Sequence, residues 1–369
     1  MRLTSTYIVI IMLLTGLAYA EDRFVDGDKG NDLKPVGQPQ GANDCLDRNT
    51  PCKTITQAIK RSKPGDRIHA KAWTYKEGEE FPLLVKWRLE IVPWGSDTPK
   101  PVIDAGPAQA AIIIGADAGG SLVRGFYIKF SPAANADESF VAPDVTNPLE
   151  KTGQNFQAAL VVQSASFVQL KKLTVDLKDK GGTGILLRES RFGEIIENTV
   201  LGKGGREDKE HDGIRLEGGA NNTLSGNQVS NHDGAGIFMD RSHENMLLNN
   251  TVVGNFFGIA LIESSNNILL DNEATGNTLG GIGLACVAAS CNGNKVLKNR
   301  AGSTRKLSGI MLVGKFTDTA LKGNIATLNA KAGIELAGDF RNTLISGNAA
   351  NNNCQAGLFV EFQGLERNA

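Results

Sequence analysis

The sequence predicts an all-β fold, a single-stranded right-handed parallel β-helix (solenoid) with a short N-terminal capping helix. Two regularities carry this prediction. An apolar strand opened by Gly returns every 22 to 29 residues between Thr183 and Asn353, and an Asn follows most of these glycines at an offset of 14 or 15. The glycines of the repeat are Gly184, Gly213, Gly236, Gly258, Gly281, Gly309, Gly333 and Gly357. Internal repeats of this length are the sequence signature of solenoids.

The strands of the repeat are short and closely spaced, which leaves no room for the crossover helices of a doubly wound sheet. A coil of 22 to 24 residues that holds two or three strands can close on itself. Stacked coils then pair each strand with its equivalent about 4.8 Å away. The crossover rule makes such a parallel β-helix right-handed. We expect about eleven coils in all.

The first twenty residues have the features of a bacterial-type signal peptide. Arg2 supplies a positive charge, residues 7–17 form an apolar run, and Ala18-Tyr19-Ala20 is a small-x-small cleavage site. No later segment approaches the ~20 apolar residues of a membrane-spanning helix. We therefore predict that residues 1–20 are removed and that one β-helix domain, residues 21–369, is exported to the periplasm or the extracellular space.

A capping region, residues 21–80, is expected to precede the coils of about 81–369. Thr54 is a favourable N-cap residue for a predicted helix of about two turns at 54–62. One apolar stripe runs along this helix: Ile55, Ala58 and Ile59. A short amphipathic helix ahead of a repeat array is suited to cover the open end of the solenoid core.

The asparagines of the repeat form three rows at the spacing of the coils. The first row is Asn198, Asn227, Asn250, Asn272, Asn299, Asn324 and Asn348. The second is Asn222, Asn245, Asn267 and Asn294, and the third is Asn231, Asn255, Asn277, Asn329 and Asn353. Stacked Asn side chains can hydrogen-bond to one another, and Asn tolerates the left-handed backbone of a sharp turn. We interpret all three rows as structural ladders.

Five cysteines fit an oxidising compartment, in which disulfides persist. Cys45 and Cys52 lie 7 residues apart, and Cys286 and Cys291 lie 5 apart in a loop insertion. We predict that each pair forms a disulfide that staples a local loop. Cys354 is left over, and we expect it to be a small buried residue of the last coils.

The chain resembles the pectate-lyase-like superfamily of right-handed β-helix proteins. Besides the repeat, four stretches are similar to the opening of many exported β-helix proteins: Phe24-Val25-Asp26, Cys52-Lys53-Thr54-Ile55-Thr56-Gln57-Ala58, Pro64-Gly65-Asp66-Arg67-Ile68 and Trp73-Thr74-Tyr75. The resemblance implies the fold, but the superfamily includes lyases, hydrolases, epimerases, esterases and non-enzymes. The sequence lacks the Trp-Ile-Asp-His of pectate lyases, the Asn-Thr-Asp and Gly-His-Gly of polygalacturonases and the Asp-Pro-His of mannuronan epimerases.

Charged residues concentrate on the outer face of three consecutive coils. In each repeat strand the residues one and three after Gly are apolar and face inward, so those at positions two and four face outward. Position four aligns Arg188, Glu217 and Asp240 at about 4.8 Å per coil, and position two adds Arg215. Two stacked carboxylates require a compensating charge. Acid/base chemistry on a sugar, calcium binding by Glu217 and Asp240, and a solvated ion-pair ladder remain open.

Further candidates lie at the turns that lead into these strands, where His211-Asp212 and His232-Asp233 each precede a repeat Gly. In the similar alginate and chondroitin lyases, Lys and Arg on adjacent coils abstract the proton. We therefore consider as catalytic candidates Lys209, His211, Arg215, Glu217 and Asp240. The candidate substrate-binding residues are Arg188, Asp212, His232, Asp233 and Arg241.

Two loops, at 131–157 and 202–212, are expected to leave the same corner of the solenoid, and such loops commonly wall a groove. The candidate groove lies around residues 188–244. Farther along the chain, the outward positions become small or apolar: Ala260, Ile262, Gly283, Ala285, Met311 and Val313. That stripe is a second candidate surface, for a partner or a covering loop.

The net charge of −1 argues against a nucleic-acid or polybasic membrane-binding surface. Two function classes remain open. The first is an exported protein that binds, or as an enzyme processes, an acidic polysaccharide in the groove, with a polysaccharide lyase as the leading enzyme class. The second is a non-catalytic periplasmic or cell-envelope scaffold or accessory protein of the NosD kind. Only five Met and four His argue against copper handling. Calcium is the one cofactor considered, and the oligomeric state stays open.

Overall fold

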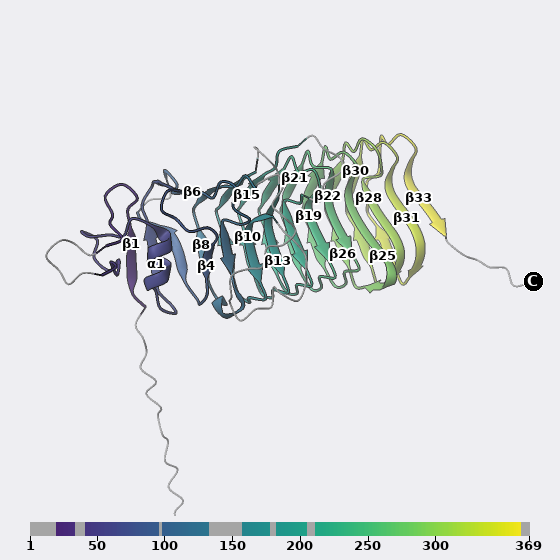
Figure 1. The fold of residues 1–369 in the computed structure, drawn as a ribbon. Helices are drawn as coiled ribbons and strands as arrows, with labels where there is room; N and C mark the ends of the chain where they lie inside the picture. The colour runs from purple at the N-terminus through teal and green to yellow at the C-terminus, as the bar shows by residue number, and fades with distance from the viewer. Residues whose placement is uncertain are drawn as a thin grey trace, which may run out of the picture.

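The computed structural model describes residues 20–33, 41–95, 98–132, 157–177, 182–204 and 211–362. These residues form an elongated parallel β-solenoid of about ten turns, whose coils stack from α1 at one end to β33 at the other (Figure 1). Three parallel sheets of 12, 11 and 10 strands line the solenoid, and we name them sheets 1, 2 and 3 in that order. The predicted fold class is confirmed.

Sheet 1 consists of β1 (Asp22–Val25), β2 (Arg67–Ala70), β5 (Glu90–Pro93), β8 (Leu122–Arg124), β11 (Gln169–Lys171), β14 (Glu194–Ile196), β17 (Thr223–Ser225), β20 (Met246–Leu248), β23 (Ile268–Leu270), β26 (Lys295–Leu297), β29 (Ala320–Lys322) and β32 (Leu344–Ser346). Its strands follow the corner at which each coil leaves sheet 2.

Sheet 2 contains the Gly-led strands and consists of β4 (Leu83–Val85), β7 (Ile112–Ile114), β10 (Ala158–Gln163), β13 (Thr183–Arg188), β16 (Ile214–Glu217), β19 (Ala235–Asp240), β22 (Phe257–Ile262), β25 (Gly280–Asn292), β28 (Ile310–Thr317), β31 (Ala332–Arg341) and β33 (Ala356–Phe362). A single 3-10 turn, η1 (Ala116–Ala118), follows β7.

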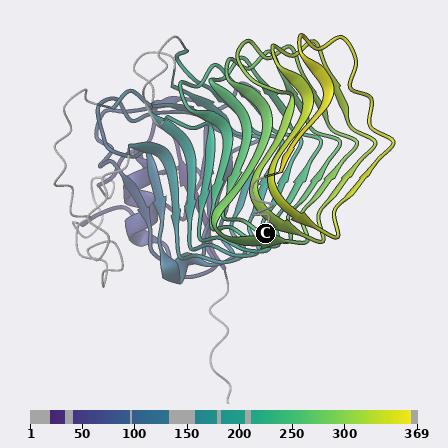
Figure 2. The ribbon, with the colours of Figure 1, turned by 90° about the vertical axis from the view of Figure 1, so that its right-hand side faces the viewer.

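Sheet 3 closes each coil and consists of β3 (Thr74–Tyr75), β6 (Val102–Asp104), β9 (Tyr127–Lys129), β12 (Thr174–Asp176), β15 (Thr199–Leu201), β18 (Gln228–Ser230), β21 (Thr251–Val253), β24 (Glu273–Thr275), β27 (Arg300–Gly302) and β30 (Ile325–Thr327). Seen from the C-terminal end, equivalent strands of successive coils lie behind one another (Figure 2).

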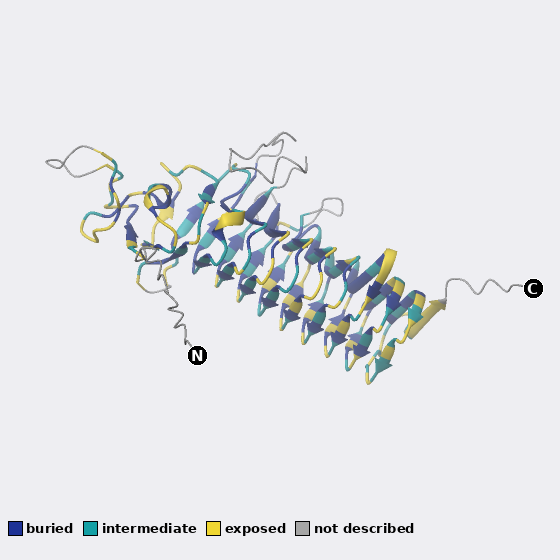
Figure 3. Cartoon of the chain, turned by 90° about the horizontal axis from the view of Figure 1, so that it is seen from below, coloured by how far each residue is buried: buried dark blue, intermediate teal, exposed yellow. Residues whose placement is uncertain are grey.

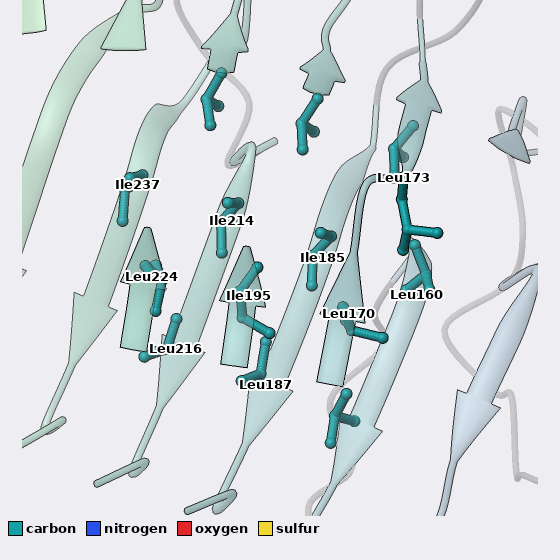
Figure 4. Close-up of a cluster of buried hydrophobic side chains, with 14 of the residues drawn as sticks. Leu160, Leu170, Leu173, Ile185, Leu187, Ile195, Ile214, Leu216, Leu224 and Ile237 are labelled. Atoms are coloured by element: carbon teal, nitrogen blue, oxygen red, sulfur yellow. The ribbon is translucent and has the colours of Figure 1, made fainter. Parts of the chain in front are cut away.

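The Gly-Ile repeat sets the register of sheet 2. Ile185 pairs with Ile214, Ile214 with Ile237, and Ile237 with Ile259, one coil at a time. These side chains are fully buried, and they point into the interior opposite the leucines and isoleucines of sheet 1 (Figure 4). Each coil thus adds one layer to a continuous apolar core, which is why the repeat length is so regular.

The first two asparagine rows are buried ladders, as predicted. Asn227 donates from Nδ2 to the Ile195 carbonyl at 2.8 Å and to Asn250 Oδ1 at 2.9 Å, while its own Oδ1 accepts from the backbone N–H of Asn198 at 3.0 Å. The other members of both rows repeat this pattern from coil to coil. Each ladder therefore satisfies the buried polar backbone of the turns.

The third row needs a correction, because His232 and not Asn231 stands in the ladder. The backbone N–H of His232 donates to Asn255 Oδ1 at 2.9 Å, and Asn255 continues to Asn277. Asn231 lies one residue earlier at the turn, with a φ of 61°. The spacing already indicated this: His232 precedes Asn255 by 23 residues, as Asn227 precedes Asn250, whereas Asn231 precedes it by 24.

Helix α1 (Ile55–Arg61) covers the N-terminal end and packs against β1, β2 and β4 (Figure 1). Thr54 is its N-cap, and Thr54 Oγ1 accepts from the Gln57 N–H at 3.1 Å. The carboxylate of Glu79 accepts from the N–H groups of Ile55 and Thr56 at 2.7 and 2.8 Å. The predicted capping helix is confirmed.

Both predicted disulfides, Cys45–Cys52 and Cys286–Cys291, are formed. The expectation that Cys354 is buried is wrong, since this free cysteine is exposed. It lies just before β33, the last strand of sheet 2, which is itself largely exposed (Figure 3). Within the described residues no further coil covers this end, so positions that are buried elsewhere in the solenoid meet solvent here.

Several predictions concern residues outside the described part. They are most of the signal peptide, at residues 1–19, most of the loop at 131–157, and residues 205–210 of the second loop. Among the described residues, no helix is both long and apolar enough to cross a membrane.

Candidate functional site

The charged residues predicted to share one face lie where three neighbouring strands of sheet 2 end. Parallel pairing sets Arg188 at the end of β13 opposite Glu217 of β16, and Glu217 opposite Asp240 of β19. We call these three residues the charged row. The alignment predicted from the Gly-Ile repeat is confirmed, because the register of a parallel sheet carries each position to its equivalent in the next coil.

Glu217 is the centre of an ion-pair network. Arg188 Nε lies 2.7 Å from Glu217 Oε2, and Arg215 Nε lies 2.7 Å from Glu217 Oε1. Arg215 extends the network through its Nη1, which lies 2.8 Å from Asp212 Oδ2. Each carboxylate oxygen of Glu217 therefore has its own guanidinium partner, and the flanking arginines compensate the stacked acidic charges.

Burial alone would raise the pKa of Glu217, but hydrogen bonds and charge from Arg188 and Arg215 outweigh it and hold that pKa below its ordinary value. Desolvation likewise opposes the charge of Arg215, yet Asp212 and Glu217 raise its pKa. At neutral pH Glu217 is therefore an ionised carboxylate, which suits a positioning or binding role better than that of a proton donor.

Asp240 closes the row and pairs with the next residue in the chain. Arg241 donates from Nη2 and Nε to Asp240 Oδ2 at 2.8 and 3.1 Å, and its side chain is 75% exposed. A calcium ion between Glu217 and Asp240 would have to displace an arginine from Glu217. Across the described part of the chain, no three or more His, Cys, Asp or Glu residues group as a metal site would require.

An aromatic ring adjoins the charges. The guanidinium of Arg215 lies over the ring of Phe238, 4.5 Å from its centroid, and Phe238 pairs with Arg215 across β16 and β19. The candidate set above omits Phe238, although the same register count places it at outward position two. Its contact with Arg215 provides a flat surface beside the charged row.

Three of the predicted substrate-binding residues are buried instead of facing a groove. Asp212 accepts the backbone N–H of Ala235 at 2.7 Å as well as Arg215, so it ties two coils together. Asp233 is 6% exposed. His232 is 3% exposed, with Nε2 3.4 Å from the Val200 carbonyl oxygen. Burial lowers the pKa of His232 to about 4, so this ring is neutral at physiological pH.

The prediction that His232 contacts substrate is therefore wrong, because its ring occupies a ladder position inside the solenoid. Asp212 and Asp233 are corrected in the same way, although Asp212 does orient Arg215. His211 remains at the turn beside the row, where its carbonyl oxygen accepts the Gly234 N–H at 3.2 Å. Lys209 lies outside the described residues.

Two hollows lie at the N-terminal end of the solenoid and not at the charged row. One, of about 560 Å³, is lined by residues of α1 and β4 together with Trp87. The other, of about 380 Å³, lies beside Trp73 and β3. The charged row instead occupies a lateral, partly exposed face, which is the shape expected for an extended ligand and not for an enclosed small molecule.

Comparison with known proteins identifies the class to which this architecture corresponds. A family model for a right-handed β-helix region matches residues 158–304. Among curated proteins, no sequence matches this chain. The resemblance to the right-handed parallel β-helix superfamily is confirmed at the level of fold.

Two solved structures illustrate the likeness. A GH136 lacto-N-biosidase from Eubacterium ramulus is 12% identical, with a TM-score of 0.58, over 93% of this chain and 68% of the other. A polygalacturonase from Erwinia carotovora ssp. carotovora is also 12% identical, with a TM-score of 0.50, over 90% of this chain and 100% of the other. At this identity the likeness shows the fold alone.

Proposed function

We propose that this protein is an exported polysaccharide-binding β-helix that holds an acidic polysaccharide across the lateral face formed by the ends of β13, β16 and β19. Export is supported by the two disulfides, which persist in oxidising compartments. A carbohydrate ligand is supported by the two β-helix structures above, which are by name a lacto-N-biosidase and a polygalacturonase.

The observation that carries the proposal is the arrangement around Glu217. Two guanidinium groups, two partly exposed carboxylates and the ring of Phe238 lie on one face within three coils. Such a face offers donors and acceptors for sugar hydroxyls together with an apolar surface for a pyranose ring. Arg241 adds a largely exposed cation that can exchange Asp240 for the carboxylate of a uronate.

The locked state of Glu217 favours binding over catalysis. Both of its oxygens are engaged by arginines, and its pKa lies below the ordinary value, so it neither donates a proton nor offers a free oxygen. The same observation favours the second candidate function, a non-catalytic envelope scaffold or accessory protein, should no glycan bind. A polysaccharide lyase remains the enzyme class that the sequence resemblance implies.

Isothermal titration of residues 21–369 with oligogalacturonates and oligomannuronates, and with neutral oligosaccharides of equal length, tests the proposal. The acidic oligomers are expected to bind, and Arg241→Gln is expected to weaken them about five- to tenfold, because one exposed charge-assisted contact is lost. Arg341→Gln is the matched control: Arg341 is 77% exposed and pairs with Asp339 at 3.4 Å, but it lies at the end of β31.

The same mixtures, followed by ultraviolet absorbance, report unsaturated uronates, the product of a lyase. Binding without this product supports a binding protein, and its appearance would establish the lyase. Silence toward every acidic and neutral oligomer contradicts the proposal and leaves the scaffold function. An equal loss in Arg241→Gln and Arg341→Gln would move the binding face away from the charged row.

A further inference from the structure

Two exposed phenylalanines stack at the corner next to the charged row. The ring centroids of Phe167 and Phe192 lie 4.9 Å apart with an angle of 11° between the rings. Their exposed fractions are 59% and 46%. Phe192 follows Arg188 by four residues, at the corner where each coil passes from sheet 2 into sheet 1. This pair, which we call the phenylalanine stack, is therefore adjacent to the proposed binding face.

The backbone at this corner disfavours phenylalanine. Counting back two residues from each sheet 1 strand gives one equivalent position in nine coils, and φ is positive at all of them. These residues are Gly120, Phe167, Phe192, Asn221, Glu244, Asn266, Gly293, Asp318 and Asn342. Gly and Asn are the residues that tolerate left-handed backbone most readily, whereas a bulky side chain there is an outlier.

Packing does not explain the two rings either. More than half of Phe167 and nearly half of Phe192 are exposed, so neither belongs to the apolar core. The neighbouring coils manage the same corner with Gly120 on one side and Asn221 on the other. A pair of residues that the backbone disfavours and that the core does not use points to a role outside the fold.

The ends of the stack are open to a ligand. The ring of Phe167 faces the coil of Gly120, which has no side chain, and the ring of Phe192 faces the coil of Asn221, which has a small one. A cation lies on the first side: a side-chain carbon placed at Gly120 would come within 3.4 Å of Arg88 Cδ, so the exposed Arg88 side chain lies over this glycine.

We propose that the phenylalanine stack and Arg88 form a further subsite for an acidic pyranose ring of the same polysaccharide. The C–H face of the sugar would rest on the ring face of Phe167, since an aromatic face carries partial negative charge. The carboxylate of the sugar would meet the Arg88 guanidinium. The subsite rests on the proposed function, and it extends the bound chain from the charged row around the corner of the solenoid.

Asparagine provides a decisive test, because it is the residue that other coils use at this corner. The double variant Phe167→Asn/Phe192→Asn is expected to keep the thermal midpoint of the wild type or to raise it. Its affinity for long oligogalacturonates is expected to fall about tenfold, as for the loss of one stacked ring. Affinity for the disaccharide, which spans the charged row alone, is expected to stay within about twofold.

Leu328→Asn is the matched control, since Leu328 is 61% exposed, has a φ of 60° and lies at a different corner, after β30. Arg88→Gln separates charge from stacking: it is expected to weaken acidic oligomers and to leave neutral ones of equal length unchanged.

The outcomes distinguish the two proposals. If wild type binds acidic oligomers and Arg241→Gln weakens them, but the double Asn variant binds like wild type, the subsite is overturned and the proposed function stands. If wild type binds no acidic oligomer, both are overturned. A fall in thermal midpoint for the double Asn variant but not for Leu328→Asn would show that the stack is structural, and would also overturn the subsite.

Discussion

Sheet 2 has one register but two kinds of outer surface. In β10 and β13 every residue is buried, including the outward-facing Val161 and Leu186. From β22 onward the strands alternate, and the outward Ile262 and Val313 are 37% and 38% exposed. The charged row lies between these two stretches. The first stretch and the row therefore hold side chains with specific partners on the outside, whereas the second is a repeating scaffold with small or apolar residues.

The two stretches share the same interior, which shows where the fold and the function are separated. Buried isoleucines and asparagine ladders continue through both without interruption. Stability is therefore expected to depend on the inside equally in both stretches. Binding is expected to depend on the outside of the first stretch and the charged row alone.

The largest predicted effect tests the common interior. Asn227→Ala and Asn299→Ala each remove a fully buried side chain that donates to a carbonyl and accepts a backbone N–H. Because buried groups then lose their partners, each variant is expected to lose about 3–5 kcal/mol of unfolding free energy. Chemical denaturation measures this, and a difference of more than about 2 kcal/mol between the variants would contradict an equal interior.

The next effect is expected in the charged row only. Glu217→Gln removes the counter-charge shared by Arg188 and Arg215, and is expected to cost about 2–4 kcal/mol because the pair is largely buried. Glu335→Gln is the matched change in the second stretch, where Glu335 accepts only the Ser308 hydroxyl among the described contacts. It is expected to cost under about 1 kcal/mol.

The cost of Glu217→Gln is also expected to depend on pH. The folded-state pKa of Glu217 lies below its ordinary value of 4.5, so its stabilising contribution is complete above that value. It is lost as the pH falls through the folded-state pKa. Denaturation curves of wild type and variant should therefore converge in acid. A difference that is constant from pH 7 down to pH ~3 would contradict an ionic origin.

How much of this could be predicted depends on whether a count or a side-chain conformation decides it. The fold and the alignment of the charged row follow from counting, because coil length fixes the register and alternation fixes the face. Counting cannot tell how Glu217 divides its two oxygens between Arg188 and Arg215, because that depends on side-chain conformations. The distinction between an acid/base residue and a locked ion pair therefore needed the structure.

The errors have the same origin. Asn231 was favoured for the third ladder by residue type, although the count of 23 pointed to His232. A His at that position loses the surface and gains a buried environment, which removed it from the binding candidates. The phenylalanine stack was visible in the count as well, since Phe167 and Phe192 hold equivalent corner positions, but aromatic residues do not match the usual composition of turns.

His232 allows the ladder itself to be tested at one coil. Its folded-state pKa of about 4 lies below the ordinary 6.5, so the folded protein binds fewer protons between these values than the unfolded chain. Stability is therefore lost as the pH falls from 6.5 to about 4, by up to about 3 kcal/mol. His232→Asn restores the residue used by neighbouring coils, and thermal midpoints from pH 7 to 4 should then show a shallower decline than wild type. A decline as steep as that of wild type would mean that other groups govern this range.

The smallest expected effect lies on the outside of the second stretch. Val313→Thr changes a side chain that is 38% exposed and nearly conserves its volume, so the unfolding free energy should change by less than about 0.5 kcal/mol. Affinity for acidic oligosaccharides should not change, because Val313 lies on β28, three strands beyond the end of the charged row. Titration of Val313→Thr beside Arg241→Gln makes the comparison within one experiment. A loss of affinity in both would extend the binding face along the whole of sheet 2, and the contrast between its two stretches would then concern burial but not ligand binding.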